Sequence, residues 1–292
     1  MTAARSGLVI VDKPSGWTSH DAVARIRRLA GTRRVGHAGT LDPMATGVLV
    51  VGVEKATRLL GHLALADKTY TGTIRLGQAT DTDDAQGEVV SAANAARLTD
   101  DQLRAAAAAL TGRIRQVPPQ VSAVKVGGVR AYRMARAGQR APLREREVTV
   151  YTFEITGSLR AGTLIDADIS VRCSSGTYIR ALARDLGAAL GVGGHLTVLR
   201  RTRVGRYRLD AARTLDELAA SFDVLPLAEV AAAEFPRRDV TAAEAERVAH
   251  GVPLPATGLG PGPVAVFGPE GGLLALVEEE GAHARPLAVF VP

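Results

Sequence analysis

The segment that most constrains the fold is a short apolar run, Val48–Val53, which follows a loop rich in glycine. Four of its six residues are valine, and it is apolar on both faces, as in a central strand buried from two sides. In the preceding loop, Pro43 fixes its own φ and disfavours the α region for Asp42. The sequence therefore predicts a rigid loop that holds one carboxylate at the mouth of a core strand.

Two interpretations of Asp42 follow from the local pattern. An aspartate before a proline is also typical of a helix N-cap or a turn, and this structural role is the more common one. The longer string Gly36–Leu49, GHAGTLDPMATGVL, favours the catalytic interpretation, because it resembles the catalytic-loop motif of the TruB family of tRNA pseudouridine-55 synthases. Further segments that resemble the family occur in the same order along the chain: Asp12–Ser19, Lys68–Tyr70, Thr80–Gly87, Pro118–Lys125 and Ser175–Arg180.

Hydrophobic periodicity indicates both helices and strands before residue 233. We expect strands at residues 7–12, Lys68–Leu76 and Leu164–Cys173. We expect helices at Ser19–Ala30, capped by Ser19, at Glu54–Ala66 and at Thr99–Leu110. Two further helices should follow Gly176 and Thr214, and the one after Gly176 should carry Tyr178 and Arg180 in its first turn. Residues 223–233 are interpreted as a connector. The resemblance implies an α+β pseudouridine-synthase core, residues 1–232, built on a mixed, mostly antiparallel sheet with flanking helices and a thumb-like insertion.

The last part of the chain has a different character. Thr241 and Glu244 form a capping box for a helix through His250, and glycines and prolines separate three short strand patterns: Val264–Phe267, Leu273–Val277 and Leu287–Val291. We therefore expect a small, mostly β domain at residues 233–292, where the family carries a PUA-type RNA-binding domain.

Arginine-rich segments dominate the first part of the chain. The formal net charge is +6, of which residues 235–292 contribute −3 and residues 1–234 contribute +9. Residues 113–146 hold nine basic side chains against one acid, and a second cluster spans residues 200–208. Such runs are often solvated faces. Arginine, however, forms bidentate hydrogen bonds with phosphate, which favours a nucleic-acid partner. The resemblance places an RNA-binding thumb at about residues 116–146, with Arg133 and Arg136 as contacts.

Cofactor and metal motifs are lacking. The sequence has no dinucleotide-binding GxGxxG loop and no P-loop, so we expect no cofactor. Asp81, Asp83 and Asp84 lie close together but do not have EF-hand spacing, and we expect no metal. The single cysteine, Cys173, cannot form an internal disulfide and is interpreted as a small buried residue.

The resemblance implies an isomerisation of uridine in the T-arm stem-loop of tRNA, with the target base flipped out of its stack. Asp42 is then the nucleophile, Arg180 its counter-ion, and Tyr70 the residue that stacks on the uracil and accepts the C5 proton. The resemblance also implies supporting roles: His37 is a stacking wedge, Asp84 supports Arg180, and Lys13 lies beneath the loop. It places Tyr178 and Leu199 along the uracil pocket.

Alternatives to a stand-alone enzyme remain open at the level of sequence. An RNA-binding and folding module would fit the basic thumb equally well, and a tRNA-folding role is expected beside the isomerase activity. The catalytic subunit of a guide-RNA complex is a third possibility, but the chain lacks long lysine-rich extensions. We expect a cytoplasmic monomer with no obligate protein partner and no membrane contact, because no apolar run or signal-peptide pattern is present.

Overall fold

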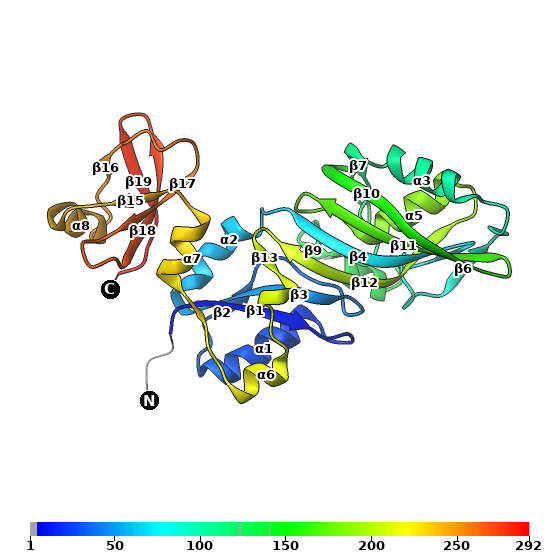
Figure 1. Ribbon diagram of the computed structural model, residues 1–292, viewed down its shortest axis with the longest axis horizontal. Coiled ribbons are helices and arrows are strands. Elements are labelled where there is room, and N and C mark those ends of the chain that lie inside the picture. Colours follow the sequence, from blue (N-terminus) through cyan, green and yellow to red (C-terminus); the bar gives the residue numbers. More distant parts are fainter. Residues whose placement is uncertain (1–4, 123, 140, 292) are drawn as a thin grey trace.

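A twisted ten-stranded sheet runs through the larger part of the molecule (Figure 1). The computed structural model describes residues 5–122, 124–139 and 141–291. Strand order in the sheet is β14-β1-β3-β12-β4-β11-β10-β7, with β13 paired to β12 and β2 to β3. The strands are β1 (Gly7–Lys13), β2 (Val35–His37), β3 (Thr46–Val53), β4 (Lys68–Leu76), β7 (Gly112–Gln116), β10 (Arg146–Ala161), β11 (Leu164–Cys173), β12 (Gly194–Val204), β13 (Tyr207–Arg208) and β14 (Leu225–Pro226).

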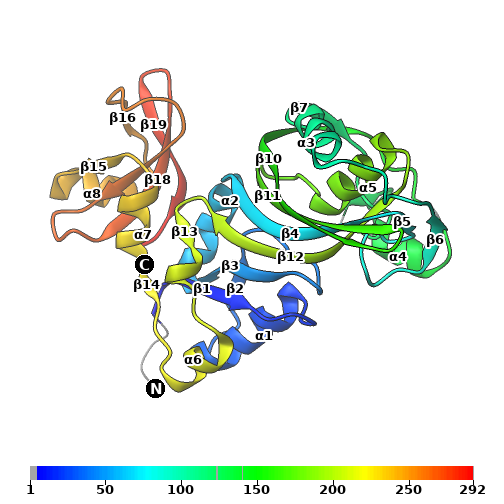
Figure 2. The ribbon, with the colours of Figure 1, turned by 45° about the vertical axis from the view of Figure 1, so that its right-hand side comes forward.

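Helices cover this sheet in two groups (Figures 1 and 2). α3 (Asp100–Ala109) and α5 (Ile179–Ala189) pack against the half that contains β10, β11 and β4, while α1 (Ser19–Ala30) and α6 (Leu215–Ala220) pack beside β1. Shorter elements connect them: a 3₁₀ turn η1 (Glu54–Leu59), α2 (Leu60–Leu63), the β5–β6 hairpin (Gln78–Thr80, Val89–Ala92) and η2 (Leu209–Ala211). The expected α+β class is confirmed.

The central strand β3 joins the two halves of the sheet. It pairs antiparallel with β1 along seven positions and parallel with β12 at Thr46 and Gly47. Every other described pairing in this sheet is antiparallel, so the expected mixed, mostly antiparallel sheet is confirmed. Gly47 has φ +99°, and a Cβ there would lie 2.2 Å from the carbonyl oxygen of Arg201. Only glycine allows β12 to approach β3 this closely.

A small, mostly β domain follows α7 (Leu227–Glu234), as expected. Its five-stranded sheet has the order β15-β17-β18-β19-β16 and carries α8 (Ala242–Ala249). The strands are β15 (Arg237–Asp239), β16 (Leu254–Pro255), β17 (Pro263–Phe267), β18 (Leu273–Glu280) and β19 (His283–Val289). One apolar cluster contains both Phe267 and Phe290 of this domain and Val48 of β3, and Lys55 Nζ donates to the carbonyl of Phe290 at 2.6 Å.

The thumb segment contains a two-stranded hairpin, β8 (Lys125–Val126) and β9 (Val129–Arg130), followed by α4 (Ala131–Arg136). This agrees with the expected arm with a hairpin and a short helix. Among the described residues, no helix combines the length and apolar composition of a membrane span.

Several local expectations need correction. Thr18, rather than Ser19, caps α1, because Asp21 completes a capping box with Thr18. Residues 54–66 form a 3₁₀ turn and only one short α-helix. The supposed connector at 223–233 supplies an edge strand and a helix, and the last strand begins at His283 instead of Leu287. Tyr178 is the N-cap of α5 rather than part of its first turn.

Candidate active site

The Asp42 loop, residues 38–45, connects β2 to β3 and is fixed at both ends by buried polar contacts. Ser19 Oγ accepts a hydrogen bond from the Leu41 amide at 2.8 Å and donates to the Leu41 carbonyl at 3.1 Å. The Ala38 amide donates to Val50, and the Ala45 amide to Asp42. Ser19 thus ties the first residue of α1 to the loop, directly after the Thr18 cap.

Lys13 supports the loop from below, where the resemblance implied it would lie. Its side chain is fully buried, and Nζ donates to the carbonyls of Pro14, Trp17 and Pro43 at 2.8, 2.6 and 3.3 Å. Burial lowers the pKa of Lys13 to about 8, although the Asp42 carboxylate acts in the opposite direction. The ammonium group therefore ties the segment after β1 to the residue that follows Asp42.

Arg201, on β12, is a second buried cation that sequence reasoning missed. It is fully buried, and its guanidinium donates to three backbone carbonyls, those of Val48 at 2.7 Å, Gly39 at 3.1 Å and Thr40 at 3.3 Å. Its only signal in the sequence was the arginine cluster at 200–208, which we interpreted as a phosphate-binding face. For Arg201 that interpretation is wrong, because its guanidinium is buried and occupied by three backbone carbonyls and so is not part of a solvated phosphate-binding face.

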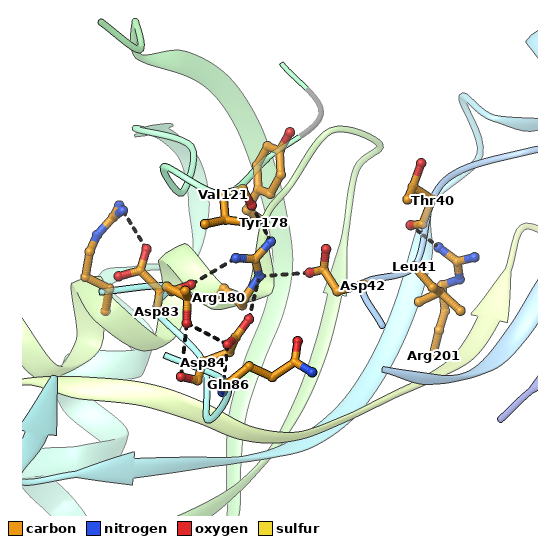
Figure 3. A network of polar contacts seen from close by, with 12 residues as sticks. Thr40, Leu41, Asp42, Asp83, Asp84, Gln86, Val121, Tyr178, Arg180 and Arg201 are labelled. Atoms are coloured by element: carbon orange, nitrogen blue, oxygen red, sulfur yellow. Dashed lines mark hydrogen bonds and ion pairs between the residues drawn. The ribbon is translucent and has the colours of Figure 1, made fainter. Parts of the chain in front are cut away.

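Arg180 converges on Asp42 from the start of α5 (Figure 3). Its Nε lies 2.8 Å from Asp42 Oδ2, and its two remaining nitrogens donate to the carbonyls of Thr82 and Val121, both at 2.9 Å. Arg180 is only 3% exposed. A cation at a helix N-terminus opposes the helix dipole. The Asp42 carboxylate and the two carbonyls compensate for this position.

Asp84 approaches the same nitrogen of this guanidinium as Asp42 does (Figure 3). Its Oδ2 is 3.5 Å from Arg180 Nε, and its Oδ1 accepts from Thr82 Oγ1 at 2.7 Å and from the Gln86 amide at 3.0 Å. The carboxylate is almost fully buried. Asp84 thus fixes the turn whose Thr82 carbonyl holds Arg180, which fits a supporting position rather than a reacting one.

The Asp42 carboxylate borders a cavity of about 270 Å³. The walls come from the Asp42 loop, β4, β12 and the start of α5, and include Tyr70, Leu199, Tyr178, Lys68 and Arg201. The Asp42 side chain is 34% exposed. The carboxylate is therefore only partly shielded from solvent in the free protein.

Tyr70 is buried in this cavity wall. Burial raises the pKa of Tyr70 above its ordinary value, while the neighbouring Arg201 guanidinium acts in the opposite direction. Burial likewise raises the pKa of Tyr178. Both rings are therefore neutral phenols at physiological pH, with flat apolar faces that a base could contact.

His37 lies at the end of β2, immediately before the loop, and does not line the cavity. Its ring makes an edge contact with His20 at a centroid distance of 5.8 Å, and its Nδ1 is buried without a hydrogen-bond partner among the described residues. Burial lowers the pKa of His37 below its usual range. A neutral ring beside the loop is consistent with a stacking position and unsuited to binding phosphate.

Arg133, the described member of the two predicted thumb contacts, does not line the cavity. Arg133 is exposed on α4, and the side chain of Arg136 lies outside what the structure describes. The base of the thumb nevertheless reaches the site, because the Val121 carbonyl accepts from Arg180 and Ser122 lines the cavity. Among the described residues, no group of three or more His, Cys, Asp or Glu side chains is arranged to hold a metal ion.

Three family models match successive parts of the chain. Residues 27–179 match the model described as TruB family pseudouridylate synthase, N-terminal domain. Residues 180–226 match tRNA pseudouridylate synthase B C-terminal domain, and residues 235–291 match tRNA Pseudouridine synthase II, C-terminal. Together the three models extend over nearly all of the chain from residue 27 onward.

Curated relatives are similar over almost their whole length. The chain is 62% identical over 288 residues to tRNA pseudouridine synthase B of Thermobifida fusca (strain YX), covering 97% of this chain and 98% of that protein. It is 56% identical over 298 residues to the protein of the same name from Arthrobacter sp. (strain FB24), covering 98% and 97%. The protein of that name from Mycobacterium bovis (strain ATCC BAA-935 / AF2122/97) is 55% identical over 293 residues, covering 100% and 98%.

Solved structures share the fold over the whole chain. A chain of a Cbf5-Nop10-Gar1 complex superposes with a TM-score of 0.74 at 28% identity, covering 99% of this chain and 86% of that chain. A chain of an H/ACA RNP bound to a substrate RNA containing 2′-deoxyuridine gives a TM-score of 0.73 at 26% identity, covering 98% and 85%.

Proposed function

This chain belongs to the TruB family of pseudouridylate synthases, and we propose that it converts uridine 55, in the T-arm of tRNA, to pseudouridine. The observation that carries the proposal is the ion pair between Asp42 and Arg180 at the wall of a cavity. The names of relatives that are 55–62% identical over nearly their whole length support tRNA as the substrate.

The reaction exchanges the N1–C1′ glycosidic bond of uridine for a C5–C1′ bond. A proton leaves C5 and a proton is gained at N1, so the change needs no oxidant or reductant. The target base lies inside a folded loop and must be flipped outward to reach the cavity. Unstacking costs a few kcal/mol, which contacts to the flipped base and the RNA backbone offset.

Asp42 acts as the nucleophile in this proposal. The carboxylate forms a covalent bond to the sugar as uracil leaves, the base rotates within the cavity, and C5 then displaces the carboxylate, which regenerates the free aspartate. Arg180 holds Oδ2 from one side, which orients the group and compensates its charge while the base excludes water. The two carbonyl contacts of Arg180 keep the guanidinium in place as bonds form and break.

The other cavity residues take binding roles in this proposal. Tyr70 packs its neutral ring against the uracil. To accept the C5 proton it must first give up its own hydroxyl proton, and its raised pKa opposes that loss. Tyr178 and Leu199 complete the pocket, Lys13 and Asp84 hold the loop and Arg180, and His37 fills the space that the flipped base vacates.

We also propose how the remaining parts of the chain serve this reaction. Residues 1–232 form the catalytic domain, the thumb at about 116–146 closes over RNA through Arg133 and Arg136, and residues 233–292 form a PUA-like domain. The protein acts as a cytoplasmic monomer without an obligate protein partner. Arg133 is exposed on α4 and does not line the Asp42 cavity, which also favours a tRNA-folding role that does not need the acid.

Mapping pseudouridine in a treated tRNA transcript tests the proposal. We expect the purified chain to place pseudouridine at position 55 alone, in the absence of added metal or cofactor. A transcript with cytidine at position 55 is the matched control and should stay unmodified. Pseudouridine at another position, or none in a correctly folded transcript, would contradict the proposed substrate site.

A further inference from the structure

A second cavity, of about 660 Å³, lies beside the segment that follows β1 and shares no lining residue with the Asp42 cavity. We call it the Trp17 groove. Its walls come from that segment, from one face of α1, from β12 and from the start of α6, and the residues that matter here are Lys13, Trp17, Arg25, Arg28, Arg200 and Asp216. The proposed reaction uses none of its exposed side chains.

Trp17 is the only tryptophan of the chain and is 37% exposed. The backbone around it is held firmly, because Lys13 Nζ donates to the Trp17 carbonyl at 2.6 Å and the Gly16 amide donates to the Pro43 carbonyl at 2.9 Å. A large aromatic ring on a fixed loop, partly open to solvent, has the properties of a platform on which a nucleic-acid base stacks.

The groove is positively charged, because four basic side chains and two acidic ones, Asp12 and Asp216, line it. Arg25 and Arg28 lie three residues apart on α1, and within the described residues neither guanidinium has an ion-pair or hydrogen-bond partner. Arg27, between them, donates to the Val35 carbonyl and is therefore occupied. Asp12 is neutralised by both terminal nitrogens of Arg200, at 3.2 and 2.6 Å. Two free guanidinium groups beside an aromatic ring match a phosphate backbone with its base.

The groove adjoins the Asp42 loop on the α1 side. Lys13, which lines the groove, donates to the Pro43 carbonyl, and Ser15 Oγ donates to the Met44 carbonyl at 3.3 Å. The thumb contacts the site elsewhere, through the Val121 carbonyl and Arg180. We therefore expect an RNA strand with one nucleotide in the Asp42 cavity to reach Trp17 past the Asp42 loop, away from the contact between Val121 and Arg180.

We propose that the Trp17 groove binds an unpaired nucleotide of the substrate RNA, distinct from the flipped uridine. The base of that nucleotide stacks on the indole of Trp17, and Arg25 and Arg28 pair with the phosphates on either side of it. This assignment rests on the proposed function, because it takes the ligand to be the same RNA whose uridine enters the Asp42 cavity.

Intrinsic fluorescence tests the contact directly, because every tryptophan signal comes from Trp17. Asp42→Asn protein, which we expect to bind RNA without turning it over, is titrated with unmodified tRNA transcript. We expect the emission to be quenched and to saturate at the dissociation constant that filter binding gives, whereas inorganic phosphate leaves the emission unchanged. Unchanged emission under conditions where filter binding shows a complex would overturn the proposal, and quenching by phosphate alone would reduce the site to an anion site.

Substitutions separate stacking from charge. Trp17→Ala should weaken tRNA binding by about 5- to 150-fold, the range for loss of one stacked base, and Trp17→Phe should restore much of the affinity. Replacing Arg25 and Arg28 together by alanine should reduce the slope of log Kd against log salt by about 1.4. Arg104→Ala, which removes an exposed arginine paired with Asp101 on α3, is the charge control. A double variant with the same slope as the control would refute the phosphate contacts.

Pseudouridine formation by the wild-type chain is measured in parallel. Quenching without pseudouridine would overturn the proposed function and leave the groove as an RNA site. Pseudouridine without quenching would overturn the groove and leave the proposed function intact. Circular dichroism and thermal unfolding of each variant show whether lost binding reflects lost structure.

Discussion

At the scale of single residues, buried cations organise the site around one carboxylate. Arg180 contacts Asp42 directly, whereas Lys13 and Arg201 act on the backbone on either side of it. Each cation satisfies several carbonyls at once, so removing one would leave buried acceptors without donors, at about 1–3 kcal/mol for each. The position of Asp42 therefore depends on side chains far from it in the sequence.

Lys13 makes this dependence measurable through pH. Its pKa is about 8 in the folded protein, against the ordinary value of 10.5 that applies to the unfolded chain. Between pH 8 and 10.5 the unfolded chain therefore binds more protons than the folded protein. The contribution of Lys13 to the free energy of unfolding should accordingly rise as pH increases from 8 to 10, and stay constant below 8. Urea unfolding at a series of pH values should show a smaller rise for Lys13→Met than for wild type.

Lys68 offers a parallel case, because burial also lowers its pKa to about 8. Lys68→Met should reduce the same rise, and the double variant should reduce it further. Equal pH profiles for wild type and both variants would show that neither ammonium group is desolvated as the structure indicates.

At the scale of elements, the parallel contact between β3 and β12 depends on Gly47. We expect Gly47→Ala to lower the free energy of unfolding by several kcal/mol and to abolish modification, because its Cβ would overlap the Arg201 carbonyl and its φ of +99° is strained for alanine. Gly61→Ala, in α2, has no atom within 4 Å of the new Cβ and is the matched control. Thermal unfolding of both variants checks this, and equal stabilities would contradict the close approach.

Elements with regular patterns were predictable from the sequence, and those with bulges were not. β4 and β11 begin and end where alternation placed them, and the capping box at Thr99 located α3. β10 and β12 went unrecognised, because each contains two register shifts that break the period of two. β12 also points Arg201 into the core. In a sequence, an arginine normally indicates an exposed position, so the pattern of β12 was misleading there.

The same limit applies to the candidate site. The family motif drew attention to Asp42 and Arg180, and the structure brings them together across 138 positions of sequence. Nothing in the sequence indicated that Thr82 and Val121 hold the guanidinium, because they do so through backbone carbonyls that every residue type provides. Such contacts follow from the fold as a whole and leave no mark on residue choice.

At the scale of the whole molecule, the C-terminal domain shares an apolar cluster with the catalytic core. Phe267 and Phe290 belong to the same cluster as Val48 of β3. In addition, Lys55 donates to the Phe290 carbonyl and Arg58 to the Val289 carbonyl. We therefore expect calorimetry to show one cooperative unfolding transition, with calorimetric and van't Hoff enthalpies that agree. Two separated transitions would mean that the shared cluster is too weak to couple the domains.

In the proposed function, Asp42 carries the chemistry while the rest of the chain binds RNA. Asp42→Asn keeps the shape of the side chain but removes its charge and nucleophilicity. The direct measurement is pseudouridine formed in a single turnover at saturating tRNA, with binding measured on the same samples. We predict no detectable pseudouridine, tRNA affinity within about threefold of wild type, and unchanged tRNA refolding. Pseudouridine formed at the wild-type rate by Asp42→Asn would contradict the account.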